Sequence, residues 1–177
     1  MARLLISTLL LVLTLAGQPK KEIEKLAPYY PTPETIVEEM LKLAGMKAGE
    51  KMFDLGSGDG RIVILAAKKG ADATGVEFDE DLYKRSTERI KKMGLEKKAR
   101  IIHGDVLQQD YSPADVITVY LLPLSNDKMR PVLEGQLKKG ARVVAHDFEF
   151  SGWNPTKVVT IEDDGEGRSH TLYLYQR

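Results

Sequence analysis

The sequence predicts an α/β protein with a Rossmann-like, doubly wound and mostly parallel seven-stranded sheet that ends in an antiparallel hairpin. Three observations predict this fold. Short apolar runs alternate with helix-forming runs from residue 32 to residue 148, as in parallel sheets with helices on both faces. The glycine-rich stretch FDLGSGDGR, residues 53–61, stands where a strand passes into a helix. Two β-rich runs around an acidic glycine turn, residues 156–176, indicate the hairpin.

Helices are expected at residues 32–46, 60–69, 79–94 and 125–140. In the first, Thr32 is the expected cap, Pro33 lies in the first turn and Gly45 ends the helix. Pro131 lies inside the last helical pattern and leaves a kink or a late start open. The expected parallel strands cover residues 51–55, 71–78, 99–105, 114–122 and 141–148.

Length and composition describe one globular domain, expected at residues 29–177. Lysine plus arginine equals aspartate plus glutamate, 26 against 26, and this balance argues against a general electrostatic hold on nucleic acid. The chain has no cysteine, which excludes disulfides, a thiolate metal site and a cysteine nucleophile. No metal site is expected.

Residues 1–18 form an apolar leader that differs from the rest of the chain. Its apolar run, residues 4–17, would rise about 21 Å as a helix, short of the roughly 30 Å hydrocarbon core. A basic start and small residues near Ala16 favour a secretory signal peptide, with a membrane-surface anchor or a packed helix as alternatives. Residues 19–28 read as a polar linker. Its lysines favour a cytoplasmic, membrane-associated domain if the leader is kept, and cleavage would export the domain.

The glycine-rich stretch predicts a ligand at the carboxyl end of the first strand, where open α/β sheets bind ligands. Glycine permits backbone angles that other residues resist, and leaves no Cβ between backbone and ligand. The dinucleotide pattern G-x-G-x-x-G fails, because Gly56 and Gly58 are followed by Arg61 at the third position. The G-x-G-x-G register is complete at Gly60, with Asp54 two residues before its start.

Two further acids end neighbouring strands. Glu77 follows Gly60 by seventeen residues, and its carboxylate could accept both hydroxyls of a ribose. Asp105 ends the third expected strand. Each acid alone could be an ordinary strand-end or turn residue. Acids at three successive strand ends predict a nucleoside ligand.

The G-x-G-x-G register with its preceding acid resembles motif I of the S-adenosylmethionine-dependent methyltransferases with a seven-stranded sheet. Five segments resemble one subgroup: YYPTPETIVEEML, DLGSGDGRIVI, YLLP, RVVAHDF and HTLYLY. This subgroup contains the mitochondrial methyltransferases that modify lysines of two membrane proteins, the ATP synthase c subunit and the adenine nucleotide translocase, and their small prokaryotic relatives. The resemblance covers about residues 29–175.

The resemblance implies S-adenosyl-L-methionine as cofactor and a role for each matching residue. Asp54 and the three glycines would line the methionine and ribose side, and Glu77 would hold the ribose. Asp105 and the N–H of Val106 would hold the adenine. The remaining implied site residues are Tyr30 and Thr32, which would close over the methionine, and Tyr120, which would border the methyl group as both a cofactor and a catalytic residue.

The same resemblance implies that the substrate is a lysine of a protein, at or near a membrane. Asp147 would orient the amine or accept its proton, although a structural acid is an alternative, as is a core tyrosine for Tyr120. No nucleic-acid partner is expected, because YLLP stands where base methyltransferases carry an N-P-P-Y-like turn. A methyltransferase of small molecules or nucleic acid, or a non-catalytic nucleotide-binding module, remain the alternative functions.

Overall fold

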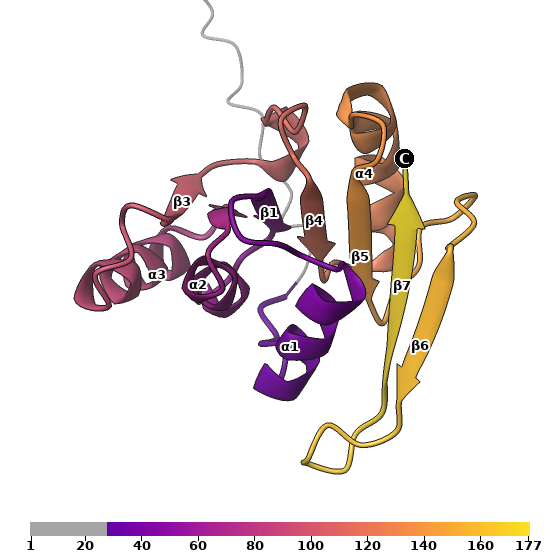
Figure 1. Cartoon of the computed structure of the whole chain (residues 1–177), viewed down its shortest axis with the longest axis horizontal. Helices are drawn as coiled ribbons and strands as arrows, with labels where there is room; N and C mark the ends of the chain where they lie inside the picture. Colours follow the sequence, from indigo (N-terminus) through magenta and orange to yellow (C-terminus); the bar gives the residue numbers. More distant parts are fainter. Residues whose placement is uncertain (1–27) are drawn as a thin grey trace, which may run out of the picture.

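The computed structural model describes residues 28–177, which form one seven-stranded sheet flanked by helices (Figure 1). The elements in chain order are α1 (Glu34–Leu43), β1 (Lys51–Leu55), α2 (Arg61–Lys68), β2 (Asp72–Glu77), α3 (Glu80–Lys92), β3 (Ala99–His103), the short 3-10 helix η1 (Val106–Gln108), β4 (Val116–Val119), α4 (Pro123–Gln136), β5 (Arg142–His146), β6 (Lys157–Ile161) and β7 (His170–Gln176).

The sheet has the strand order β3-β2-β1-β4-β5-β7-β6. The first five strands pair in parallel, and β7 pairs antiparallel with both β5 and β6. The predicted fold class is therefore confirmed, including the hairpin. The last strand along the chain lies inside the sheet, between β5 and the edge strand β6.

Hydrophobic residues pack on both faces of the sheet in two clusters. One cluster contains the buried faces of α1 and α2, and the other contains that of α4. All four residues of β4 are buried, as are the last four of β1 and of β5. These strands have apolar side chains on both faces because helices cover both faces. The polar ends of the strands are thus the places where a ligand can approach.

Several of the predicted boundaries are wrong, among them those of two helices and of one strand. Helix α1 begins at Glu34 after Pro33, and the expected cap Thr32 instead has its hydroxyl 3.3 Å from Nδ1 of His146. Helix α4 begins at Pro123 and runs through Pro131, so it does not start late. Strand β4 ends at Val119, where its pairing with the last residue of β1 and with Ala145 of β5 also stops, and residues 120–122 leave the sheet.

Within residues 28–177, none of the helices has both the length and the apolar character that a membrane crossing needs. The predictions for the leader, and for the linker up to residue 27, concern residues outside the described part of the chain. They stay predictions.

Candidate active site

A cavity of about 340 Å³ opens at the carboxyl ends of β1, β2 and β4. It brings together seven of the residues that the sequence predicts for the site. They are Tyr30, Thr32, Asp54, Gly56, Gly58, Glu77 and Tyr120. Sequence reasoning missed other lining residues, among them Ser57, Asp59, Arg61, Phe78 and Leu121.

The glycine loop between β1 and α2 needs glycine for conformation and for space. Gly56, Gly58 and Gly60 have φ angles of 75°, 53° and 76°, in the region that other residues rarely adopt. A Cβ on Gly58 would lie 2.7 Å from the ring of Tyr29. The loop therefore lies directly against the segment that precedes α1, and Arg61 joins them by donating a 2.8 Å hydrogen bond to the carbonyl of Thr32.

Glu77 places a buried carboxylate at the cavity. Its Oε2 accepts a 2.7 Å hydrogen bond from the N–H of Gly58, and its Oε1 accepts a 2.8 Å bond from the N–H of Asp79. A carboxylate offers about four lone-pair sites, so both oxygens can accept a further bond from a ligand. Two backbone N–H groups therefore hold the Glu77 carboxylate in place, and each of its oxygens can still accept a hydrogen bond from a ligand.

Asp54 is a second acid at the cavity, with a different environment. Its side chain is buried and accepts a 2.7 Å hydrogen bond from the Thr118 hydroxyl. Burial raises its pKa to about 7, although the Thr118 bond opposes the rise. A cationic ligand group beside Asp54 would favour the charged carboxylate, so this acid can respond to what the cavity holds.

Tyr120 and Asp147 form a pair at the edge of the cavity. The Tyr120 hydroxyl donates a 3.2 Å hydrogen bond to Oδ2 of Asp147. Burial, followed by the charge of Asp147, raises the pKa of Tyr120 to about 12 and keeps it neutral. Asp147 does not line the cavity itself and reaches it through Tyr120.

Asp147 is held rigidly as an anion. Its φ angle is 58°, and it is the only non-glycine residue with positive φ among residues 28–177. Burial would raise its pKa, but the N–H of Thr171 and the histidines at positions 146 and 170 lower the pKa overall. The unusual backbone angle aims the carboxylate at three neighbouring side chains at once.

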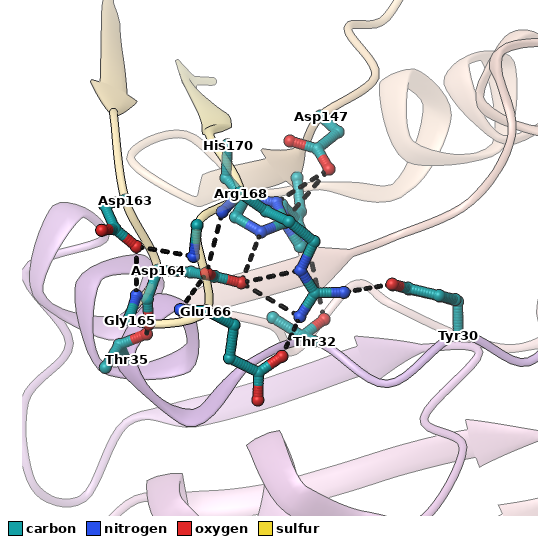
Figure 2. A network of polar contacts seen from close by, with 12 residues as sticks. Tyr30, Thr32, Thr35, Asp147, Asp163, Asp164, Gly165, Glu166, Arg168 and His170 are labelled. Atoms are coloured by element: carbon teal, nitrogen blue, oxygen red, sulfur yellow. Dashed lines mark hydrogen bonds and ion pairs between the residues drawn. The ribbon is translucent and has the colours of Figure 1, made fainter.

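His146 and His170 are site residues that sequence reasoning missed. Nε2 of His146 lies 2.9 Å from Nδ1 of His170, which lies 3.0 Å from Oδ2 of Asp147. On its other side, Nε2 of His170 lies 3.3 Å from Oδ2 of Asp164 (Figure 2). Three groups of this cluster lie within 4.8 Å of one another, but their ring nitrogens already face hydrogen-bonding partners. We therefore describe the cluster as a hydrogen-bond network.

The turn between β6 and β7 ties this network to the segment before α1 (Figure 2). Arg168 donates to the hydroxyl of Tyr30 and pairs with Asp164 at 3.0 Å. The Thr35 hydroxyl donates a 2.8 Å bond to the carbonyl of Asp164. The hairpin turn therefore fixes residues 30–35 over one side of the cavity.

Besides Asp147, three predicted site residues do not line the cavity. Gly60 is the N-cap of α2, and its missing Cβ leaves room for Ser86. Asp105 is the N-cap of η1 and accepts a 2.9 Å bond from the N–H of Leu107, while Val106 is buried in the core. Their cofactor roles stay predictions.

Comparison with known proteins agrees with this geometry. The ANTKMT methyltransferase domain family matches residues 54–157. A protein of Saccharolobus islandicus (strain REY15A), named protein-lysine N-methyltransferase, is 43% identical over 84% of this chain and 92% of its own length. A human relative, the lysine N-methyltransferase of the ATP synthase c subunit, is 33% identical over 84% of this chain, which spans 60% of the human protein.

A solved structure points to the same family. The RNA methyltransferase from Salinibacter ruber, crystallised with S-adenosyl-L-homocysteine, is 40% identical with a TM-score of 0.76, over 83% of this chain and 93% of that one. The motif, the cavity at the strand ends and the relatives agree. This chain belongs to the ANTKMT methyltransferase domain family and is an S-adenosylmethionine-dependent methyltransferase.

Proposed function

We propose that this methyltransferase transfers a methyl group to the side-chain amine of a lysine in a protein. The observation that carries the proposal is the hydrogen-bonded pair of Tyr120 and anionic Asp147 at the edge of the cavity. An aromatic face beside a fixed carboxylate suits an alkylammonium group, through cation–π contact and charge attraction. The names of the Saccharolobus islandicus and human relatives support the same substrate class.

The reaction is an in-line displacement. The amine lone pair attacks the methyl carbon, the carbon–sulfur bond breaks and its electron pair goes to sulfur. The cofactor is already activated, so the protein mainly supplies alignment. A lysine with a pKa near 10.4 is neutral in only about one molecule in 2,500 at pH 7, which costs about 4.6 kcal/mol. The positive sulfonium nearby lowers this cost by disfavouring the ammonium.

In this proposal the two buried acids, Glu77 and Asp54, contact different parts of the cofactor. Glu77 accepts hydrogen bonds from the ribose hydroxyls with the lone pairs that the backbone leaves open. Asp54 and the glycine loop lie on the methionine side, where the cationic amino group favours the charged form of Asp54. Tyr30 and Thr32 cover this side of the cavity. Asp105 and Val106 are proposed for the adenine.

RNA is the competing substrate, because the Salinibacter ruber structure carries that title. The formal net charge of zero weighs against RNA, since sequence-independent binding to phosphates needs a basic surface. Incubating the protein with methyl-labelled cofactor and a cell extract separates the two. Mass spectrometry is expected to find the label on lysines, mainly in the membrane fraction. Label found only in RNA or in a small metabolite would overturn the lysine assignment and leave the methyltransferase activity standing.

A further inference from the structure

We propose that Thr32, His146 and His170 form a proton wire that takes the proton from the substrate amine and stores it on His170. The inference rests on the proposed lysine substrate, because a lysine ammonium must lose a proton before it can accept a methyl group. Neither histidine is needed to explain cofactor binding, since neither lines the cavity.

The wire is an unbroken row of hydrogen-bonding atoms that starts at the cavity. Thr32 lines the cavity, and its Oγ1 lies 3.3 Å from Nδ1 of His146. His146 is fully buried under the ring of Tyr120, with 3.9 Å between ring centroids. Its Nε2 lies 2.9 Å from Nδ1 of His170, and Nε2 of His170 lies 3.3 Å from Oδ2 of Asp164. Each step of the row therefore joins neighbouring heteroatoms.

With both histidines neutral, one arrangement of hydrogens gives every ring nitrogen a partner, although it leaves the lone pair at Nδ1 of His170 also facing Oδ2 of Asp147 at 3.0 Å. The Thr32 hydroxyl donates to Nδ1 of His146, the N–H at Nε2 of His146 donates to Nδ1 of His170, and the N–H at Nε2 of His170 donates to Asp164. All the donors point away from the cavity. This direction leaves the oxygen of Thr32 free to accept a proton from the cavity side.

The transfer moves three protons by one position each. The substrate ammonium gives a proton to Oγ1 of Thr32, the Thr32 proton moves to Nδ1 of His146, and the proton on Nε2 of His146 moves to Nδ1 of His170. Three bonds to hydrogen break and three form, and the positive charge passes from the ammonium to His170. The neutral amine can then attack the methyl carbon of the cofactor.

His170 is the storage position because anions face both of its ring nitrogens. In the charged form, its Nδ1–H faces Oδ2 of Asp147 at 3.0 Å and Nε2 of His146, and its Nε2–H faces Asp164. The charged form thus keeps every hydrogen bond of the network. Asp147 is the partly exposed member, so the proton returns to water through its carboxylate after methyl transfer.

The charges around the wire support this direction. Burial lowers the pKa of His146 to about 4, so His146 passes the proton and does not keep it. For Asp164, burial would raise the pKa, but the N–H groups of Glu166 and Arg168 lower it to about 2. The Arg168 guanidinium faces Asp164 and not His170. Tyr120 faces Asp147 as a neutral donor.

Nuclear magnetic resonance of the ring nitrogens tests the wire without any substrate. The chain has three histidines, so labelling with ¹⁵N-histidine gives few signals, and His103→Gln assigns the one outside the network. In the resting protein, the proposed arrangement places a hydrogen at Nε2 of both His146 and His170 and none at Nδ1 of either. A hydrogen at Nδ1 of either residue in the resting protein would overturn the proposed direction.

Kinetics of two matched variants test the transfer itself. Thr32→Val keeps the shape of the side chain and removes the hydroxyl, whereas Thr32→Ser keeps the hydroxyl. Thr32→Val is expected to lower kcat at pH 7 by about 100-fold, the lower range for a lost proton acceptor. The loss should shrink towards pH 10, where substrate lysine is already partly neutral in water. Thr32→Ser should retain most of the activity.

A loss in Thr32→Val that stays constant between pH 7 and pH 10, or no loss at all, would overturn the wire. His170→Asn should show the same pH-dependent loss, with cofactor affinity unchanged by calorimetry. If the wild-type protein methylates no amine, the proposed function fails first, and the nitrogen signals still decide whether the hydrogens are arranged as proposed.

Discussion

The cofactor side and the hairpin side of the site are built in different ways. On the cofactor side, the hydrogen bond that fixes Glu77 joins residues 19 positions apart, within a single β-α-β unit. On the hairpin side, the bonds of Thr32 to His146, Thr35 to Asp164 and Arg168 to Tyr30 span 114, 129 and 138 positions. A compact local motif forms the proposed cofactor side, whereas the proposed methyl-transfer side forms only when segments distant in the sequence meet.

The two sides also treat aspartate in opposite ways. Asp54 is buried with one hydroxyl donor, and its pKa rises to about 7. Asp147 and Asp164 accept backbone N–H bonds and face histidines, and their pKa values fall. The cofactor side therefore contains an acid whose charged form is favoured when a cation binds beside it. The hairpin side contains two aspartates whose negative charges are already stabilised by backbone N–H groups and neighbouring histidines.

Among the substitutions that test the difference between the two sides, Tyr120→Ala is expected to have the largest effect. Loss of the ring removes the wall that aligns the amine and frees Asp147, and misalignment of this kind costs about 100-fold in rate. Steady-state kinetics should show the loss in kcat, and calorimetry should show nearly unchanged cofactor binding. Tyr120→Phe, which removes only the hydroxyl, should fall in between. Equal losses in turnover and cofactor affinity would assign Tyr120 to the cofactor side instead.

Glu77→Ala tests the cofactor side directly. It removes a charged acceptor for two hydroxyls and should weaken cofactor binding by roughly 1–3 kcal/mol. Calorimetry measures the change, and kcat at saturating cofactor should remain close to normal. Glu88→Ala, an exposed acid on α3, is the matched control. Unchanged affinity in Glu77→Ala would contradict the ribose assignment.

Asp54 predicts how cofactor binding depends on pH. Its pKa in the free protein is raised to about 7, so it is increasingly protonated below pH 7 and charged above it. The cationic cofactor favours the charged form, so affinity should weaken by up to about tenfold per pH unit as the pH falls below 7. Binding measured between pH 5.5 and 8 in Asp54→Asn should lose this dependence. A wild-type affinity that stays flat over this range would be inconsistent with a cation beside Asp54.

The raised pKa of Asp54 also affects folding stability. Its contribution to stability decreases with rising pH, whereas its contribution to cofactor affinity increases. The folded protein binds this proton more tightly than the unfolded chain does. The contribution of Asp54 to stability is therefore greatest below its ordinary pKa, and it decreases as the pH rises towards 7. In Asp54→Asn, thermal unfolding followed from pH 4 to pH 8 without cofactor should decline less. An unchanged pH profile would contradict the raised pKa.

The smallest effect is expected for Arg168→Ala, which cuts the link between the hairpin turn and Tyr30. Because this arginine is partly exposed, the decrease in the free energy of unfolding should be small. Limited proteolysis should nevertheless cut the segment at residues 28–35 faster than in the wild type. Lys157→Ala on the same hairpin is the control. Equal cleavage rates in both variants would show that the turn does not hold this segment.

The sequence predicted most of the fold because the fold follows local patterns. The order of strands and helices and the hairpin were confirmed, and Asp54, Glu77 and Tyr120 line one cavity in the structure. Thr32 looked like a helix cap because it precedes a proline and a glutamate. A buried histidine 114 residues away faces its hydroxyl instead. Local patterns do not report such a partner.

The histidine network could not be predicted for the same reason. His146 and His170 stand on β5 and β7, and only the antiparallel register of these strands, which pairs His146 with Leu172, brings the two rings together. Tyr120 and Leu121 are hydrophobic, so the sequence predicted a longer strand. The chain turns at Gly56, directly after β1, so no residue of β1 pairs with them in the sheet. In each case the missing information was the position of a neighbouring element.

The position of β7 between β5 and β6 affects how the chain is completed on the ribosome. Strand β6 is synthesised before β7 and has no neighbour in the sheet until β7 enters beside it. A chain that stops before His170 therefore leaves one edge of β5 and both edges of β6 unpaired, and unpaired strand edges are prone to aggregation. The same missing strand carries the residue that would store the proton. A chain truncated before β7 would thus expose unpaired strand edges and would also lack His170, the proposed proton acceptor.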